Sequence, residues 1–297
     1  MKKAFLELHI AVWLAGFTGV LGKLITLNEG LLVWYRLFIS SITMWILFSL
    51  TKKLQRISLK DILKLTGIGF LAALHWVCFY GSIKYANVSV GLVCFSAVGF
   101  FTALLEPLFM KKRINVVEVL LGLVVIAGIY IIFQFDPKYK TGIILGVLCA
   151  LLLAVNIILL RQFVQRINSQ TVLTYQLSGG LITLTLLMPF YLKQFPASYI
   201  IPNLSDWMWL FVLSWFCSVL AFQFSMNALK KLTAFTVNLS FNLEPVYGII
   251  LAFAIFHENK ELGWSFFSGL LLIILALGLQ MWRVWYQSKN SKVVATS

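Results

Sequence analysis

Apolar residues run along the chain in long stretches, and short polar segments separate them. A helix that crosses a membrane needs about 20 mostly apolar residues, and the chain contains ten stretches of this kind. They lie near residues 5–27, 31–51, 63–85, 88–110, 116–134, 142–163, 171–193, 206–229, 235–256 and 262–285. The pattern therefore predicts an all-α membrane protein with ten transmembrane helices.

The composition agrees with a lipid environment. Hydrophobic residues make up 61% of the chain and charged residues 11%, and the mean hydropathy is +0.92. An ordinary soluble domain carries about 25% charged residues, so the composition argues against a large soluble α/β protein. The first residues have the basic start and apolar run of a signal peptide, but Glu7 and His9 interrupt that run. We interpret the segment as an uncleaved first span.

The chemistry-bearing residues give no sign of a cofactor. The four cysteines occur singly in apolar stretches, which predicts buried thiols rather than disulfides or a metal site. The three histidines, His9, His75 and His257, fall near one membrane face, the middle and the other face, too far apart to share a metal. No GxxxxGK[ST], HExxH or GxSxG motif is present. We therefore expect no cofactor, no ATP-driven pump and no intramembrane enzyme.

The net charge of +14 is distributed as in a membrane protein rather than a nucleic-acid-binding protein. With the N-terminus in the cytoplasm, 17 of the 24 Lys and Arg residues fall in cytoplasmic segments and five in external segments, while Lys23 and Arg36 lie within spans. This asymmetry follows the positive-inside rule. We expect a multi-pass protein of the plasma (bacterial inner) membrane, with both termini and a tail at 289–297 in the cytoplasm and no nucleic-acid partner.

The chain also repeats. Residues 76–113 align with residues 222–259 at a constant offset of 146, without a gap. Each half, 1–137 and 138–288, holds five predicted spans, and an odd number makes the second half enter the membrane from the opposite side. The halves are therefore predicted to be inverted repeats. Lys112 and Glu258 occupy the same repeat position, one basic and one acidic.

Ten spans, this duplication and the ninth span, LEPVYGIILAFAIFHE at 243–258, resemble the EamA-type drug/metabolite transporters. Members show an Ala-Leu-Lys-like entry, a Glu-Pro or Ser-Pro within the span and an exit glutamate, matched here by ALKK at 228–231, Glu244-Pro245 and Glu258. The resemblance covers the whole chain and implies transport of small solutes. In the first half, Gly99 and Lys112 replace the proline and the exit glutamate, and LEP at 105–107 lies eight residues out of register.

Glu244 and Pro245 are the first candidates for a site. The pair falls near the middle of the ninth span, where a charge costs about 2.5–3.5 kcal/mol on insertion scales. Pro245 cannot donate a backbone hydrogen bond, and Asn238 and Asn242 lie one turn apart just before it. We expect a kinked, polar segment that binds substrate or gates the path. The alternative is a packing role, with Glu244 hydrogen-bonded or neutral.

The other candidates lie in spans two and three. His75 falls in the middle of its span and Trp76 and Phe79 follow it, so these side chains are predicted to face a central cavity. Their alternative role is ordinary packing. Arg36 lies a few residues inside the second span, where it either extends to the membrane surface or attracts an anionic group or a gate residue.

The pattern favours a secondary transporter of small organic metabolites, most simply an exporter of amino acids or similar compounds that works by alternating access. Glu244 or His75 could bind a coupling proton, and facilitated diffusion is equally open. The alternative is an importer of a sugar-like or quaternary ammonium solute, and a more distant one is a receptor or intramembrane enzyme. The expected partners are the small-molecule substrate and membrane lipid; the sequence does not determine the oligomeric state.

Overall fold

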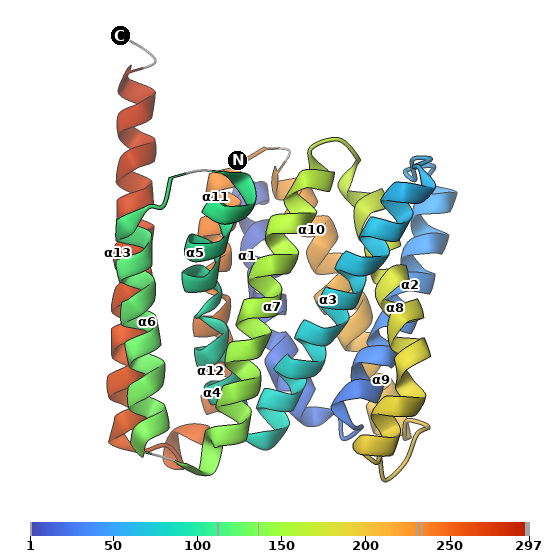
Figure 1. The fold of residues 1–297 in the computed structure, drawn as a ribbon, viewed down its shortest axis with the longest axis horizontal. Coiled ribbons are helices and arrows are strands. Elements are labelled where there is room, and N and C mark those ends of the chain that lie inside the picture. Colours follow the sequence, from blue (N-terminus) through green and yellow to red (C-terminus); the bar gives the residue numbers. More distant parts are fainter. Residues whose placement is uncertain (1, 112, 136, 230, 233, 295–297) are drawn as a thin grey trace.

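Helices and the turns and loops between them form the fold in the computed structural model, which describes residues 2–111, 113–135, 137–229, 231–232 and 234–294. Seven single helices make up most of the bundle (Figure 1): α1 (Lys2–Leu24), α2 (Glu29–Leu50), α3 (Leu59–Tyr85), α6 (Val116–Phe135), α7 (Lys140–Val164), α8 (Ser169–Gln194) and α13 (Trp264–Val294).

Three further runs through the bundle are made of shorter segments. They are α4 (Val88–Phe95) with α5 (Val98–Met110); α9 (Leu204–Phe211), the π-helix η2 (Val212–Leu220) and α10 (Ala221–Leu229); and α11 (Ala234–Phe241) with α12 (Glu244–Phe256). Short 3₁₀ turns, η1 (Pro137–Tyr139) and η3 (Glu258–Lys260), lie before α7 and after α12.

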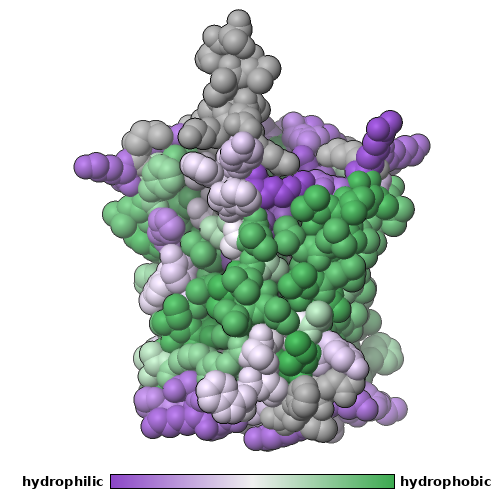
Figure 2. Space-filling model, turned by 90° about the vertical axis from the view of Figure 1, so that its left-hand side faces the viewer, coloured by the Kyte–Doolittle hydropathy of each residue, from purple (hydrophilic) through white to green (hydrophobic). Residues whose placement is uncertain are grey.

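The helices are those of an integral membrane protein. Among the described residues, eight helical stretches are long and apolar enough to cross a membrane, and Val116–Ile132 and Glu244–Phe256 are shorter apolar helices. The face formed by α6 and α13 carries a broad hydrophobic band between two hydrophilic ends (Figure 2), and large side chains such as Leu120 and Leu275 are exposed there. Apolar side chains point outward because the surrounding solvent is lipid.

The two ends of the bundle differ in charge. α1 begins and α13 ends at one end (Figure 1), which also holds the connections α2–α3, α5–α6 and α7–α8 with their Lys and Arg residues. We call this the basic end. The opposite end, which we call the latched end, holds the α1–α2, α3–α4, α8–α9 and α12–α13 connections. α13 continues to Val294, so residues 289–294 of the predicted tail extend the last helix.

The sequence repeat is visible in the helix bounds. α4 and α11 begin at residues 88 and 234, α5 and α12 begin at 98 and 244, and each pair differs by the offset of 146 found in the sequence. Both runs end in a left-handed residue, Lys111 with φ 50° and His257 with φ 54°. The two runs point in opposite directions through the bundle (Figure 1). Lys112, the predicted counterpart of Glu258, lies outside the described residues.

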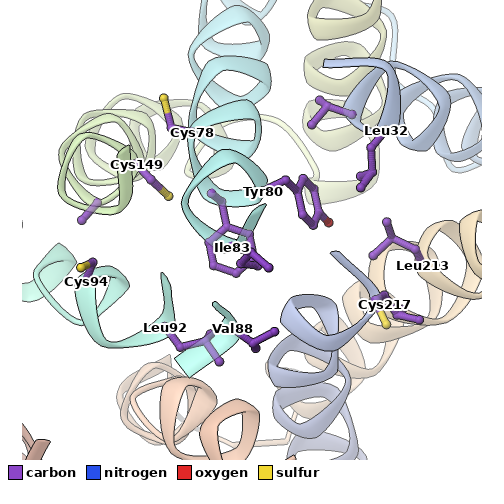
Figure 3. Packing of buried hydrophobic residues seen from close by; sticks show 14 of the residues in the cluster. Leu32, Cys78, Tyr80, Ile83, Val88, Leu92, Cys94, Cys149, Leu213 and Cys217 are labelled. Carbon is purple, nitrogen blue, oxygen red and sulfur yellow. The ribbon is translucent and has the colours of Figure 1, made fainter. Parts of the chain in front are cut away.

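Buried apolar side chains from both halves fill the centre. Figure 3 shows Tyr80 of α3 pointing between Leu32 of α2 and the η2 residues Leu213 and Cys217. All four cysteines are free and buried, as predicted. Among the described residues, no group of three or more His, Cys, Asp and Glu side chains is arranged to hold a metal.

Candidate functional site

Two breaks in the helices create the centre of the site. α4 ends at Phe95 and α5 begins at Val98, while α11 ends at Phe241 and α12 begins at Glu244. The breaks occupy the same repeat position. The chain keeps backbone hydrogen bonds through both breaks, from the Ala97 nitrogen to the Cys94 carbonyl and from the Leu243 nitrogen to the Ser240 carbonyl, each at 3.0 Å. Each break is therefore a tightened turn in the middle of the bundle.

Pro245 stands in the first turn of α12. Two residues separate α11 from α12, and Leu243 between them keeps a right-handed helical conformation, so the ninth predicted span is a helix interrupted just before Pro245. Proline suits the start of a helix because its missing N–H would have no partner there. The first half breaks at the same place without a proline, since Gly99 occupies the equivalent position.

A large cavity of about 670 Å³ lies beside the breaks. This volume is within the range of pockets that hold small organic ligands, roughly 300–1,000 Å³. The cavity runs from Glu244 at the middle of the bundle to Arg113 and Asn115 at the basic end. Its apolar walls come from α5, α6, α7 and α13, and its polar lining includes Ser96, Thr102, Glu106, Glu118, Asn242 and Gln280.

A smaller chamber of about 100 Å³ adjoins it. Phe95 and Glu244 line both spaces and so form the boundary between them. The chamber brings together five of the side chains predicted from the sequence: Arg36, His75, Trp76, Phe79 and Glu244. Ala15, Thr18, Phe95 and Cys217 complete its lining.

The remaining predicted residues fall as follows. Pro245 and Asn242 line the large cavity. Asn238 lies in α11, but its side chain is outside the described part of the structure. Glu106, which the repeat register leaves aside, lines the large cavity and forms an ion pair with Arg161 at 2.7 Å.

Glu244 is the first residue of α12, and its side chain is only partly buried. Within the described part of the chain, no hydrogen bond or ion pair reaches its carboxylate, and the residue lines both spaces. Its backbone is tightly packed. A Cβ atom added to Gly16 of α1 would lie 2.9 Å from the carbonyl oxygen of Glu244 and 2.9 Å from the backbone nitrogen of Gly248.

Arg36 lies in the interior, with a relative exposure of 5%. Its Nη1 donates to the Tyr80 hydroxyl at 2.7 Å and its Nε to the Ser218 hydroxyl at 3.1 Å. The guanidinium carbon lies 4.2 Å from the centre of the Trp76 ring, which is a cation–π distance. The interpretation that Arg36 extends to the membrane surface is therefore wrong, because its hydrogen bonds and the Trp76 ring hold the side chain at the chamber.

The π-helix η2 supports this arrangement from the second half. Its wider turns direct Ser218 toward Arg36, and Ser214 of the same segment donates to the Arg36 carbonyl oxygen at 3.4 Å. π-helical turns are rare and frequently lie at functional sites. The sequence contained no pattern that would have predicted η2 or the contact of Ser218 with a residue so distant in the chain.

His75 is buried, with a relative exposure of 6%. Its Nδ1 lies 3.8 Å from the Cys149 sulfur, and its ring is next to that of Trp76. These contacts fit both the chamber-facing role and the packing role predicted for it.

At the latched end, the carboxylate of Glu258 connects the two halves of the chain. Glu258 follows α12 and is fully buried. It accepts hydrogen bonds from the backbone nitrogens of Val88 and Ser89 at 3.1 and 2.9 Å and from the Ser89 hydroxyl at 2.6 Å. It also forms an ion pair with Lys23 of α1 at 2.9 Å. A carboxylate at a helix N-terminus is stabilised by the free N–H groups and the helix dipole, so Glu258 links the second half to the first turn of α4.

Further contacts strengthen the latched end. Asp206 at the start of α9 accepts from the Thr26 backbone nitrogen at 2.8 Å and from the Tyr199 hydroxyl at 2.6 Å. Tyr191 of α8 donates to Glu29 of α2 at 2.7 Å. The bonds of Thr26 with Asp206 and of Tyr191 with Glu29 join the two halves of the chain, and the Tyr199 hydroxyl supports Asp206 from within the second half.

Comparisons with known proteins agree on a transporter. The profile of the EamA-like transporter family matches residues 3–134 and 140–282. A relative from Bacillus subtilis (strain 168), named "Uncharacterized transporter YxxF", is 25% identical in an alignment of 207 residues that covers 67% of this chain. The match spans 64% of the length of YxxF, less than two thirds of that protein.

A solved structure shares the fold. A crystal structure aligns with a TM-score of 0.62 at 16% identity and covers 97% of this chain and 99% of its own. Because the family profile matches nearly the whole chain in two successive segments, this multi-pass membrane protein belongs to the EamA-like transporter family.

Proposed function

We propose that the protein is a secondary transporter that moves a small organic metabolite across the bacterial inner (plasma) membrane by alternating access. One observation carries the proposal. The large cavity extends from the central helix breaks to the basic end, while at the latched end Glu258 holds the two halves together through Ser89 and Lys23. A path open at one end and closed at the other is what alternating access requires of each of its states.

The proposed topology has ten spans in two inverted repeats, residues 1–137 and 138–288. The equal bounds of α4–α5 and α11–α12, and their opposite directions, support the duplication. Both termini are proposed to be cytoplasmic, because the basic end then faces the cytoplasm as the positive-inside rule predicts. The cavity is then open to the cytoplasm.

Export is the proposed direction, with amino acids or similar metabolites as solutes. A cavity open to the cytoplasm can load a cytoplasmic solute, and its lining combines apolar walls with the polar groups of the breaks. The alternative of a quaternary ammonium solute is less well supported. Such ligands bind on aromatic faces, and Arg36 already occupies the face of Trp76 in the chamber.

Transport by purified protein in vesicles tests the proposal. Vesicles loaded with single unlabelled amino acids or organic acids should accumulate the matching radiolabelled solute by counterflow, without ATP. Glu244→Gln should lower the rate or the apparent affinity for the solute that gives a signal. Counterflow no greater than in protein-free vesicles for every solute would contradict the transporter function. An unchanged transport rate and apparent affinity in Glu244→Gln would show that Glu244 has only a packing role.

A further inference from the structure

One edge of the Arg36 guanidinium has no protein partner. Nε and Nη1 donate to Ser218 and Tyr80, but no hydrogen bond within the described part of the chain involves Nη2. Because Nη2 has no partner in that part and still does not count among the fully buried polar atoms without one, it is not fully buried. Nη2 is therefore accessible, and Arg36 is one of the residues that line the small chamber.

The chamber has the size of one small planar head group. Its volume of about 100 Å³ equals the share of about three water molecules in the liquid. A guanidinium matches the planar geometry of a carboxylate and binds it through charge-assisted hydrogen bonds. The aromatic walls Phe79 and Phe95 leave no room beside such a group for a second large substituent, whereas the adjoining cavity of about 670 Å³ does.

The charge of Glu244 opposes an anion in the same chamber. With Glu244 ionised, Arg36 and Glu244 together are neutral, and a carboxylate bound on the buried Arg36 would add an uncompensated negative charge to the small chamber. Such a charge is costly. With Glu244 protonated, the carboxylate and Arg36 balance each other. Binding of the anion and protonation of Glu244 should therefore favour each other.

We propose that the small chamber binds the carboxylate of an organic acid on Arg36 together with one proton on Glu244, while the apolar part of the ligand lies in the large cavity. The proton comes from the solvent and bonds to a Glu244 carboxylate oxygen, and the ligand stays ionised. The proposal rests on the proposed transport function and specifies its substrate class: carboxylates with an apolar body, bound with a proton.

The other ionisable groups near Glu244 are poorer proton acceptors for this purpose. A proton on His75 of α3 would place a second positive charge next to Arg36 of α2. Tyr80 of α3 is already the acceptor of the Arg36 hydrogen bond. Cys217 on η2 and Cys149 on α7 carry thiols. A thiol is neutral in its protonated form, so it cannot take up a further proton to offset the charge of the bound anion.

Binding to the purified full-length protein tests the proposal. The probes are butyrate, phenylacetate and 3-phenylpropionate, each compared with its neutral amide and with an amine of the same length. Tryptophan fluorescence, to which Trp76 contributes, and calorimetry report binding from pH 5.5 to 9. All three acids are ionised through most of this range, so changes in affinity report on the protein.

The expected result has two parts. At least one carboxylate binds saturably, about tenfold or more tightly than its amide, because the amide lacks the charge that Arg36 recognises. Its affinity is constant at low pH and falls by up to about tenfold per pH unit at high pH, as the binding of one linked proton requires. Calorimetry in buffers of different ionisation enthalpy shows proton uptake on binding in the high-pH range.

Variants assign the two roles. Glu244→Gln should bind the carboxylate with an affinity that no longer falls at high pH, while His75→Gln should keep the fall. Arg36→Gln should lose the preference for carboxylate over amide. Arg166→Gln, which removes an exposed arginine paired with Asp61 at the basic end, is the matched control and should keep both properties. If Arg36→Gln does not fold, the comparison of acids with amides in the native protein still tests whether the site prefers a carboxylate.

Three outcomes would overturn the proposal: no saturable binding of any of the three carboxylates, equal affinity for an acid and its amide, or a pH dependence unchanged in Glu244→Gln. Saturable binding of amides or amines together with no binding of the acids would reject this substrate class and leave the transporter function intact.

Discussion

The Glu258 carboxylate accepts the Ser89 hydroxyl at 2.6 Å and the Ser89 backbone nitrogen at 2.9 Å, so the end of α12 is joined to the first turn of α4. The two residues come from different halves of the chain. Glu258 is fully buried, caps a helix and pairs with Lys23, so it stabilises the contact at this end. In the repeat, the equivalent position holds Lys112, a cation, which a helix N-terminus would repel.

The first prediction follows from this contact. Glu258→Gln should weaken the latched end, because charge-assisted hydrogen bonds contribute about 1.5–3 kcal/mol each. Spin labels on the exposed residues Tyr85 and Lys260, in a cysteine-free background, should report a wider distance distribution with a new population at longer distances. Glu261→Gln, at an exposed neighbouring carboxylate, is the control and should leave the distribution as in the parent. Identical distributions in both variants would show that Glu258 does not hold this end closed.

The second prediction concerns orientation. Lys111, Lys138 and Asn203 are all exposed, so a cysteine at any of them should react with a thiol reagent unless the membrane separates the two. In a cysteine-free protein in intact cells, an impermeant reagent should label cysteines at Lys138 and Asn203 and spare one at Lys111. Permeabilised cells supply the control, because all three should label there. External labelling at Lys111 would reverse the proposed topology.

Much of the fold could be predicted from the apolar stretches and the repeat in the sequence. Because each long apolar stretch must satisfy its own backbone in lipid, the positions of most helices could be predicted from the pattern of apolar stretches along the chain. The offset of 146 aligns residues 76–113 with 222–259, but the sequence predicts an irregular helix only at Glu244-Pro245, and it does not predict the equivalent break in the first half. The break after Phe95 has no local signal, since residues 96–99 read Ser-Ala-Val-Gly.

The candidate site was predictable in its residues and not in its contacts. Depth in the membrane was enough to single out Arg36, His75 and Glu244, since polar groups there must face a cavity or a partner. The partners of Arg36 could not be inferred, because Tyr80 and Ser218 are brought to it by tertiary packing and a π-helix.

The third prediction concerns Pro245. The first half breaks its helix without a proline, so Pro245→Ala should retain the break between α11 and α12. The main effect should be on the unfolded chain, which gains conformational freedom, and the stability should fall by no more than about 1 kcal/mol. Ligand affinity should stay within about twofold of the parent. Thermal unfolding and probe binding measure the two quantities, and a large loss of affinity would show that proline itself shapes the site.

The last prediction tests how α1 supports the Glu244 backbone. A methyl group on Gly16 would lie 2.9 Å from the Glu244 carbonyl oxygen and 2.9 Å from the Gly248 nitrogen, and these are backbone atoms that cannot rotate away. Gly16→Ala should therefore force α1 and α12 apart and destabilise the protein by about 1–3 kcal/mol, as overpacking does in well-packed interiors. It should also weaken ligand binding, because the start of α12 positions Glu244.

Gly67→Ala is the matched control, since Gly67 also lies within a helix but has no atoms near its added methyl group. Alanine is the better helix former by about 1 kcal/mol, so the control should be as stable as the parent or more so. Thermal unfolding of both variants at equal detergent concentration makes the comparison, and equal stability of Gly16→Ala and Gly67→Ala would mean that α1 and α12 can separate at this point without cost.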